Sequence, residues 1–129
     1  MFDIEVIRER GRTLLRLTGQ IDDPTDDLLL EAFAFVQPMD HLVLDLTSVT
    51  VLDRRGARFL HDVIDVRSVL AECVVVSTVE AVSMALVLSN VDRVSPIVRG
   101  VEQAIAILDC RGAGGVDQFG SSALAPIAL

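Results

Sequence analysis

Short apolar segments alternate with helical patterns along most of the chain, and this alternation limits the possible folds more than any other feature. Residues 2–6 alternate apolar and acidic side chains, which predicts a strand with one buried face. Residues 9–11 are typical of a turn, and residues 13–17 are expected to form a second strand. The chain should therefore open with a β-hairpin, and each later strand is separated from the next by a helix.

The later strands are strongly apolar. Residues 42–46 and 73–76 are near-continuous apolar runs, as expected of strands that are covered on both faces. Residues 94–98 predict a short last strand, and residues 47–50 are expected to be a polar turn. The order ββαβαβαβα indicates an α/β fold with a mixed sheet of about five strands, in which parallel βα units follow the hairpin.

Four helices are expected between and after these strands. The first follows Asp23-Pro24-Thr25, where an acid and a proline suit a helix start, and it should end near Val36. The others should follow Asp53, cover residues 80–90 and cover residues 101–108. The apolar residues that the second helix should bury are Phe59, Leu60, Val63, Ile64, Val66 and Leu70, with Arg58, Asp62 and Asp65 facing outward.

Composition excludes several classes of function. At 129 residues the chain is one domain, and its net charge of −8 argues against nucleic acid as a partner. Neither a signal peptide nor a membrane-spanning apolar run is expected, so we expect a cytoplasmic protein without membrane insertion. Cys73 and Cys110 fit no zinc spacing, and two reduced thiols are favoured over a regulatory disulfide.

Several short motifs occur in a familiar order. Gly19-Gln20-Ile21-Asp22 ends the second strand, Asp45 lies in the third, and Asp53-Arg54-Arg55-Gly56 begins a helix. Residues 88–94 and 101–104 complete the pattern, with Asn90 in a position where a glycine is usual. This order resembles the STAS domain of bacterial anti-anti-sigma factors. The likeness covers roughly residues 3–109, so residues 1–109 are predicted to be a STAS domain and residues 110–129 a Gly/Ser-rich tail.

The resemblance implies a regulator of transcription rather than an enzyme. Such proteins bind an anti-sigma factor, usually a serine kinase, and thereby release a sigma factor. In the family the kinase phosphorylates a serine directly after the aspartate, but here that position is Arg54. An arginine has no hydroxyl and is permanently positive, so the usual phosphorylation switch should be absent.

The expected partner-binding residues are Asp22, Asp53, Arg54, Arg55, Gly56, Arg58, Leu86 and Val87. Two arginines at a helix start oppose the helix dipole. They could contact an acidic partner or an anion, or they could simply be solvated or paired. Thr47, Ser48 and Thr50 are weak alternative phosphate acceptors, for which hydrogen bonding in a turn is the favoured interpretation.

The third helix is apolar around most of its circumference, with a narrow polar stripe near Ser83 and Asn90. The tail, a partner or a second copy of the chain could cover the surplus apolar surface, so a homodimer through this helix or the tail is an open alternative.

Candidate catalytic groups are sparse. No pattern joins His41 to His61, and the acidic pairs suit helix caps, so neither catalysis nor a metal or cofactor is expected. The alternative function is a STAS accessory module of a transporter or signalling scaffold, which would sense an anion, nucleotide or lipid at the arginines.

Overall fold

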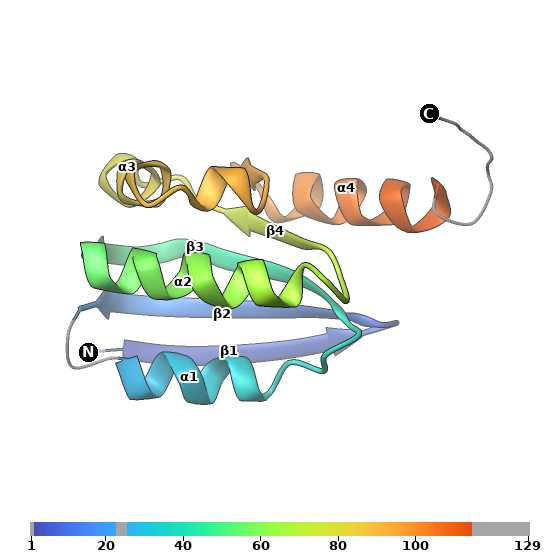
Figure 1. Cartoon of the computed structure of the whole chain (residues 1–129), viewed down its shortest axis with the longest axis horizontal. Helices are drawn as coiled ribbons and strands as arrows, with labels where there is room; N and C mark the ends of the chain where they lie inside the picture. Colours follow the sequence, from blue (N-terminus) through green and yellow to red (C-terminus); the bar gives the residue numbers. More distant parts are fainter. Residues whose placement is uncertain (1, 23–25, 115–129) are drawn as a thin grey trace.

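A mixed sheet lies at the centre of the protein, and helices cover both of its faces (Figure 1). This computed structural model describes residues 2–22 and 26–114, and within them the sheet has five strands in the order β1-β2-β3-β4-β5. Strand β1 (Phe2–Glu9) is antiparallel to β2 (Arg12–Ile21), while β3 (His41–Leu52), β4 (Cys73–Val76) and β5 (Ile97–Val98) continue the sheet in parallel. The predicted α/β class, opening hairpin and parallel units are confirmed.

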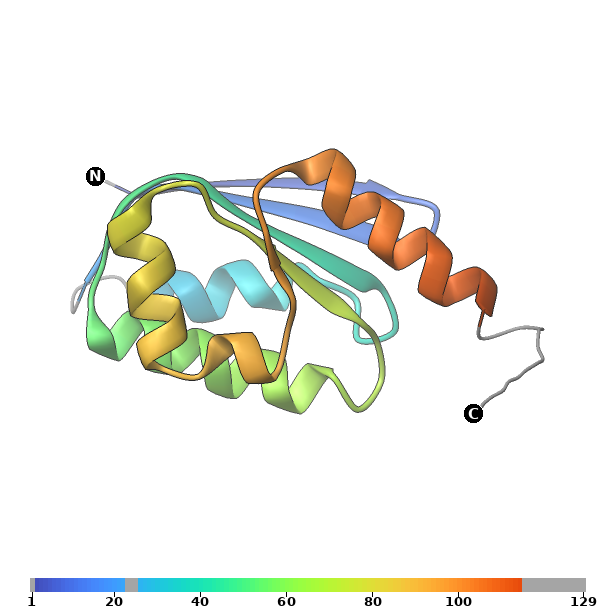
Figure 2. The ribbon, with the colours of Figure 1, turned by 90° about the horizontal axis from the view of Figure 1, so that it is seen from above.

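Four α-helices accompany the sheet in the described part of the chain. They are α1 (Asp26–Ala34), α2 (Arg54–Arg67), α3 (Glu80–Leu88) and α4 (Val101–Gly114), and a 3-10 turn, η2 (Val91–Arg93), follows α3. Helices α1, α2 and α3 pack on one face of the sheet, and α4 packs on the other (Figure 2). The expected number of helices is confirmed.

The central strands are buried on both faces, as their apolar runs predicted. Leu42, Leu44 and Leu46 of β3 belong to the larger core beneath α1, α2 and α3, whereas Val43 belongs to the smaller core beneath α4. All four side chains are inaccessible to solvent. Burial of each such side chain contributes about 1.5–3 kcal/mol, so the core positions of these strands contribute strongly to the stability of the sheet.

One charged residue interrupts this apolar strand. Asp45 is 2% exposed and lies on the face of β3 that α4 covers in part. Its carboxylate accepts hydrogen bonds from the Thr47 N–H at 2.9 Å, the Thr47 hydroxyl at 2.8 Å and the Arg16 Nε at 2.9 Å. Arg16 lies opposite Asp45 in the β2–β3 register and also pairs with Glu5 on β1 at 3.2 Å. The buried charge is therefore hydrogen-bonded and links three strands.

Strand β3 is longer than expected. Residues 47–50, which include the polar side chains of Thr47, Ser48 and Thr50, were predicted to be a turn, but β3 continues through them as far as Leu52. The reason is tertiary: β2 also extends, so that Ile21 pairs with Leu52, and Val49 is fully buried in the core. The turn prediction is therefore wrong.

Helix α2 buries a narrower set of residues than predicted. Val66 is 73% exposed, because at 100° per residue it lies 200° around the helix from the buried Ile64. Leu70 is exposed because α2 ends at Arg67, before that residue is reached. Arg67 takes the inward position after Ile64 and donates to the carbonyl oxygen of Asp40 at 2.9 Å. The predicted inward positions of Val66 and Leu70 are wrong.

The boundaries of the last elements also differ from the prediction. Helix α3 ends at Leu88, and Asn90 adopts the expected left-handed conformation with φ of 64°. The last strand begins only at Ile97. Helix α4 continues to Gly114, past the predicted boundary at Asp109, and residues 115–129 of the predicted tail lie outside the described residues. Residues 23–25, which were expected to begin α1, also lie outside them.

The two cysteines are free thiols, as the favoured interpretation required. Burial raises the pKa of the Cys73 thiol to about 12, so it remains protonated and unreactive at neutral pH. Cys110 lies on the exposed side of α4. The alternative of a disulfide between them is not realised in this structure.

Candidate functional site

The junction between β3 and α2 holds four of the expected partner-binding residues. Asp53 is the N-cap of α2, and its carboxylate accepts the N–H of Gly56 at 2.7 Å. Its carbonyl oxygen accepts the N–H of Ala57 at 2.9 Å, and its own N–H donates to the carbonyl oxygen of Ile21 at 3.0 Å. Because Asp53 bonds both to the helix and to β2, it fixes the start of α2 against the end of the sheet.

Gly56 allows the first turn of α2 to approach β2 closely. A Cβ atom placed on Gly56 would lie 2.7 Å from Cγ2 of Ile21, and it would also crowd the Leu52 side chain at 3.2 Å. Ile21 is fully buried, so it has little room to move. The role of Gly56 is thus close packing, and the residue itself is buried beneath the site surface.

We expect Gly56→Ala to destabilise the protein by about 1–3 kcal/mol, the usual cost of overpacking a core. In an open helix the same change would stabilise by about 1 kcal/mol. Gly100→Ala is the matched control, since a Cβ atom there meets nothing within 4 Å. Urea unfolding of both variants measures the difference. A Gly56→Ala protein as stable as the parent would show that Ile21 adjusts freely.

The two arginines of the first turn are both exposed, but they differ in their surroundings. Arg55 has interactions of its own, as does Asp22 at the end of β2. Arg54 forms no ion pair or hydrogen bond with any described residue, and the same holds for Arg58, one turn further along α2. Like charges at i and i+4 repel by about 0.2–0.5 kcal/mol, so local helix stability does not explain this pair.

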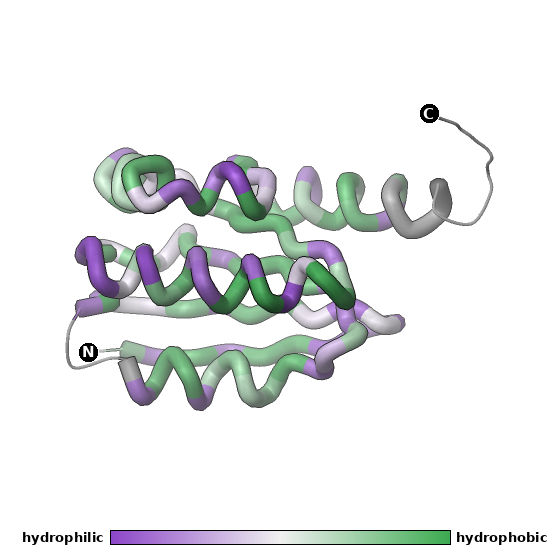
Figure 3. Tube along the Cα trace, in the orientation of Figure 1, coloured by the Kyte–Doolittle hydropathy of each residue, from purple (hydrophilic) through white to green (hydrophobic). Residues whose placement is uncertain are grey.

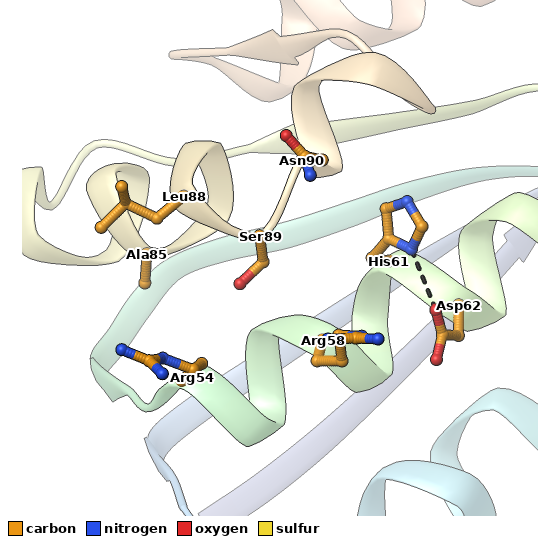
Figure 4. A pocket seen from close by; sticks show the side chains of 8 residues that line it. All are labelled: Arg54, Arg58, His61, Asp62, Ala85, Leu88, Ser89 and Asn90. Atoms are coloured by element: carbon orange, nitrogen blue, oxygen red, sulfur yellow. Dashed lines mark hydrogen bonds and ion pairs between the residues drawn. The ribbon is translucent and has the colours of Figure 1, made fainter.

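Arg54 and Arg58 line a cleft of about 650 Å³ between α2 and the end of α3. Figure 4 shows their side chains on the α2 wall together with those of His61 and Asp62. The Nδ1 atom of His61 lies 2.9 Å from the Oδ1 atom of Asp62. The opposite wall is formed by the last part of α3 and the two residues after it, with Ala85, Leu88, Ser89 and Asn90 lining the cleft. The α2 wall thus carries two unpaired arginines and one carboxylate that His61 engages, and it faces a partly apolar wall. This arrangement suits an anionic group attached to an apolar body.

The exposed surface of α3 continues this site, with one correction to the expected residues. Leu86 is completely buried in the core against the sheet, so it cannot contact a partner. Helical periodicity turns its neighbours outward instead: Met84, Val87 and Leu88 are 57%, 51% and 78% exposed. Seven of the nine residues of α3, EAVSMALVL, are hydrophobic, and green predominates where Figure 3 shows this helix nearly end-on. Val87 is at the surface, as expected.

The alternative phosphate acceptors lie on β3 rather than in a loop. The Thr47 hydroxyl donates to Asp45 at 2.8 Å, and the Thr50 hydroxyl donates to the carbonyl oxygen of Gly19 at 3.3 Å. Ser48 is exposed. Both threonine hydroxyls are thus engaged in hydrogen bonds, but within a strand and not in the expected turn.

The sequence reasoning missed most of the cleft. Arg54, Arg58 and His61 occur at i, i+4 and i+7, which places them on one face of a helix, and this spacing was the available signal. The wall formed by Ser89 and Asn90 could not be found this way, because it depends on how α3 packs beside α2.

No group of three or more His, Cys, Asp or Glu side chains suited to a metal occurs within residues 2–22 and 26–114. Among the described helices, none is long and apolar enough to cross a bilayer.

Comparison with known proteins defines the class of this chain. The family model of the STAS domain matches residues 3–104, so the chain belongs to the STAS domain family. A search of curated proteins found no match.

Two solved structures share the fold. An anti-sigma factor antagonist from Mycobacterium paratuberculosis has a TM-score of 0.78 and 22% sequence identity, over 84% of this chain and 95% of that one. A Thermotoga maritima protein, provisionally assigned as an anti-sigma factor antagonist, has a TM-score of 0.70 and 17% identity, over 84% and 94% of the respective chains. At these identities the likeness concerns the fold.

Proposed function

We propose that this chain is a non-catalytic antagonist of an anti-sigma factor, which it binds through the start of α2 and the adjoining cleft. Binding would release a sigma factor without control by phosphorylation at residue 54. The observation that carries the proposal is Arg54, an exposed guanidinium in the first turn of a helix whose Asp53 cap is intact. The STAS fold supports the proposed class of function, while the residue at the acceptor position has no hydroxyl to modify.

Electrostatics favour an acidic partner surface. The protein has a net charge of −8, yet Arg54 and Arg58 line the cleft one helical turn apart, and neither forms an ion pair with a described residue. The carboxylate of Asp62 on the same wall contacts His61 instead. A local positive site on a negative protein orients an acidic partner and raises its association rate. The proposal is tested by calorimetric titration of the full chain with purified anti-sigma factors of the serine-kinase type. If none of these anti-sigma factors bound the chain, the proposed function would be contradicted.

Incubation with such a kinase and ATP should leave the mass of the protein unchanged. Position 54 offers no acceptor, and both threonine hydroxyls of β3 are engaged in hydrogen bonds. Arg54→Ser is the matched positive control, because it restores a hydroxyl directly after Asp53. Intact mass spectrometry and peptide mapping decide the result. Stoichiometric phosphate on Ser48 or another residue would mean that the switch has moved.

A second function is favoured by the size of the cleft. A volume of about 650 Å³ falls within the range of about 300–1,000 Å³ that small-molecule sites occupy. The protein would then be a STAS accessory module that senses an anion at Arg54 and Arg58. Binding of a small anion to the cleft, together with no affinity for any anti-sigma factor, would favour this function.

A further inference from the structure

Two hollows meet on the surface formed by α2 and α3. The basic cleft described above is one of them. The other is an apolar groove of about 250 Å³ along the outer side of α3, lined by Glu80, Ser83, Met84, Val87 and Leu88. Leu88 lines both hollows and is 78% exposed, so it forms the ridge between them. We call the cleft and groove together the composite surface.

The composite surface has a direction of charge. Arg54 and Arg58 lie at its α2 side, and the acidic residue Glu80 lies at the first turn of α3, at the far end of the groove. The groove between them offers Met84 and Val87 as its largest apolar side chains. Asp62, which is hydrogen-bonded to His61, also lines the cleft. A ligand that follows this surface therefore meets two unpaired arginines beside one engaged carboxylate, then apolar side chains, then the carboxylate of Glu80.

The walls suit a segment of protein better than an enclosed small molecule. Arg54, Arg58, Leu88 and Asn90 are all exposed, so the cleft is open along its rim. Small-molecule sites usually bury most of their ligand, whereas a protein segment needs to bury only the side chains that it inserts. The unpaired arginines select acidic side chains, and the exposed side chains of α3 select apolar ones.

We propose that the composite surface binds an acidic-apolar segment of the partner protein. An aspartate or glutamate of that segment pairs with Arg54 and Arg58 in the cleft. A leucine, isoleucine or phenylalanine close to it in sequence enters the groove beside Leu88. Repulsion from Glu80 orients the segment with its acidic end over α2. The inference rests on the proposed function, because it assigns the chemistry of the contacting segment of the anti-sigma factor.

The test uses a display library of short random peptides, selected against the full-length protein, with fluorescence anisotropy of the enriched peptides. Enrichment of an acidic residue beside a large apolar one is expected. Arg58→Ala and Leu88→Ser should each weaken binding about tenfold or more. The matched controls are Arg99→Ala and Val69→Ser, which change exposed residues outside the composite surface and should leave affinity unchanged.

Two further measurements complete the test. Replacement of the acidic peptide residues by lysine should abolish binding, and added salt should weaken it. Thermal melts should be unchanged in all four variants, since each substituted side chain is exposed. Enrichment of basic or purely apolar peptides would overturn the proposal. A dimer of the free protein that is disrupted by Leu88→Ser would also overturn it, in favour of a second copy as the occupant.

The outcome separates this inference from the proposed function. Binding of an anti-sigma factor that is unaffected by Arg58→Ala and Leu88→Ser would sustain the function and refute the composite surface. Acidic-apolar peptides that depend on both residues would sustain the composite surface even if every anti-sigma factor in the set failed to bind.

Discussion

Asp45→Ala is expected to lower the free energy of unfolding by about 2–3 kcal/mol at neutral pH. The substitution removes the acceptor of three hydrogen bonds and leaves the Thr47 N–H and the Arg16 guanidinium without it. Arg16 is 36% exposed and keeps Glu5 as a partner, which limits the loss below that of a fully buried ion pair. Urea unfolding monitored by circular dichroism measures the change.

The same substitution should change how stability depends on pH. Burial by itself raises the pKa of the Asp45 carboxyl, but hydrogen bonds from the Thr47 N–H, Arg16 and the Thr47 hydroxyl outweigh it, and the net pKa is lowered. A carboxyl whose folded pKa is depressed contributes stability above its unfolded pKa of about 3.9. That contribution is lost as the pH falls through the folded pKa. The stability gap between the parent and Asp45→Ala should therefore be largest near about pH 7 and narrow below about pH 4.

Glu5→Gln is the matched control for Asp45→Ala. Glu5 contacts the same Arg16 guanidinium at 3.2 Å but is largely exposed, so its replacement should cost no more than about 1 kcal/mol. Equal losses for the two substitutions would contradict the expectation that burial and three hydrogen bonds make Asp45 more important for stability than Glu5.

Arg54→Glu combined with Arg58→Glu is expected to weaken binding of the anti-sigma factor by about 2–5 kcal/mol, or roughly 30- to 5,000-fold. The change reverses the charge of the cleft wall that faces an acidic partner. Folding should be retained, because an acidic residue at the start of α2 is favoured by the helix dipole and both side chains are exposed. Calorimetry with a captured anti-sigma factor gives the affinity, and a thermal melt reports folding.

Two comparisons make this result specific to the cleft. Arg99→Glu makes the same change in charge at an exposed position outside the cleft, so it should alter affinity only slightly. An affinity that falls equally in Arg99→Glu would indicate a general effect of net charge. Unchanged affinity in the double variant, with an unchanged melt, would mean that the arginines are solvated surface residues.

The sequence predicted the elements whose signals are local. The strands over residues 42–46 and 73–76 were found because each is a run of apolar residues, and Asn90 was placed at a helix end because its side chain tolerates a left-handed backbone. The unusual residue of the site, Arg54, was also evident, since it depends only on identity and position. Such features need no knowledge of distant contacts.

Errors arose where a distant partner decides the local structure. Thr47, Ser48 and Thr50 have polar side chains typical of a turn, yet they are part of β3 because β2 supplies hydrogen-bond partners as far as Ile21. Leu86 and Val87 are adjacent and equally apolar, but the packing of α3 on the sheet buries the first and exposes the second.

The sequence by itself determined the order of strands and helices, the arginine after Asp53 and the spacing that places Arg54, Arg58 and His61 on one face of α2. Only the tertiary structure decided that this face meets the end of α3, so that a cleft and an apolar groove share Leu88. The physical reason is that periodicity fixes directions around one helix axis. The position of a second helix instead depends on side chains that interlock across the core, far apart in the chain.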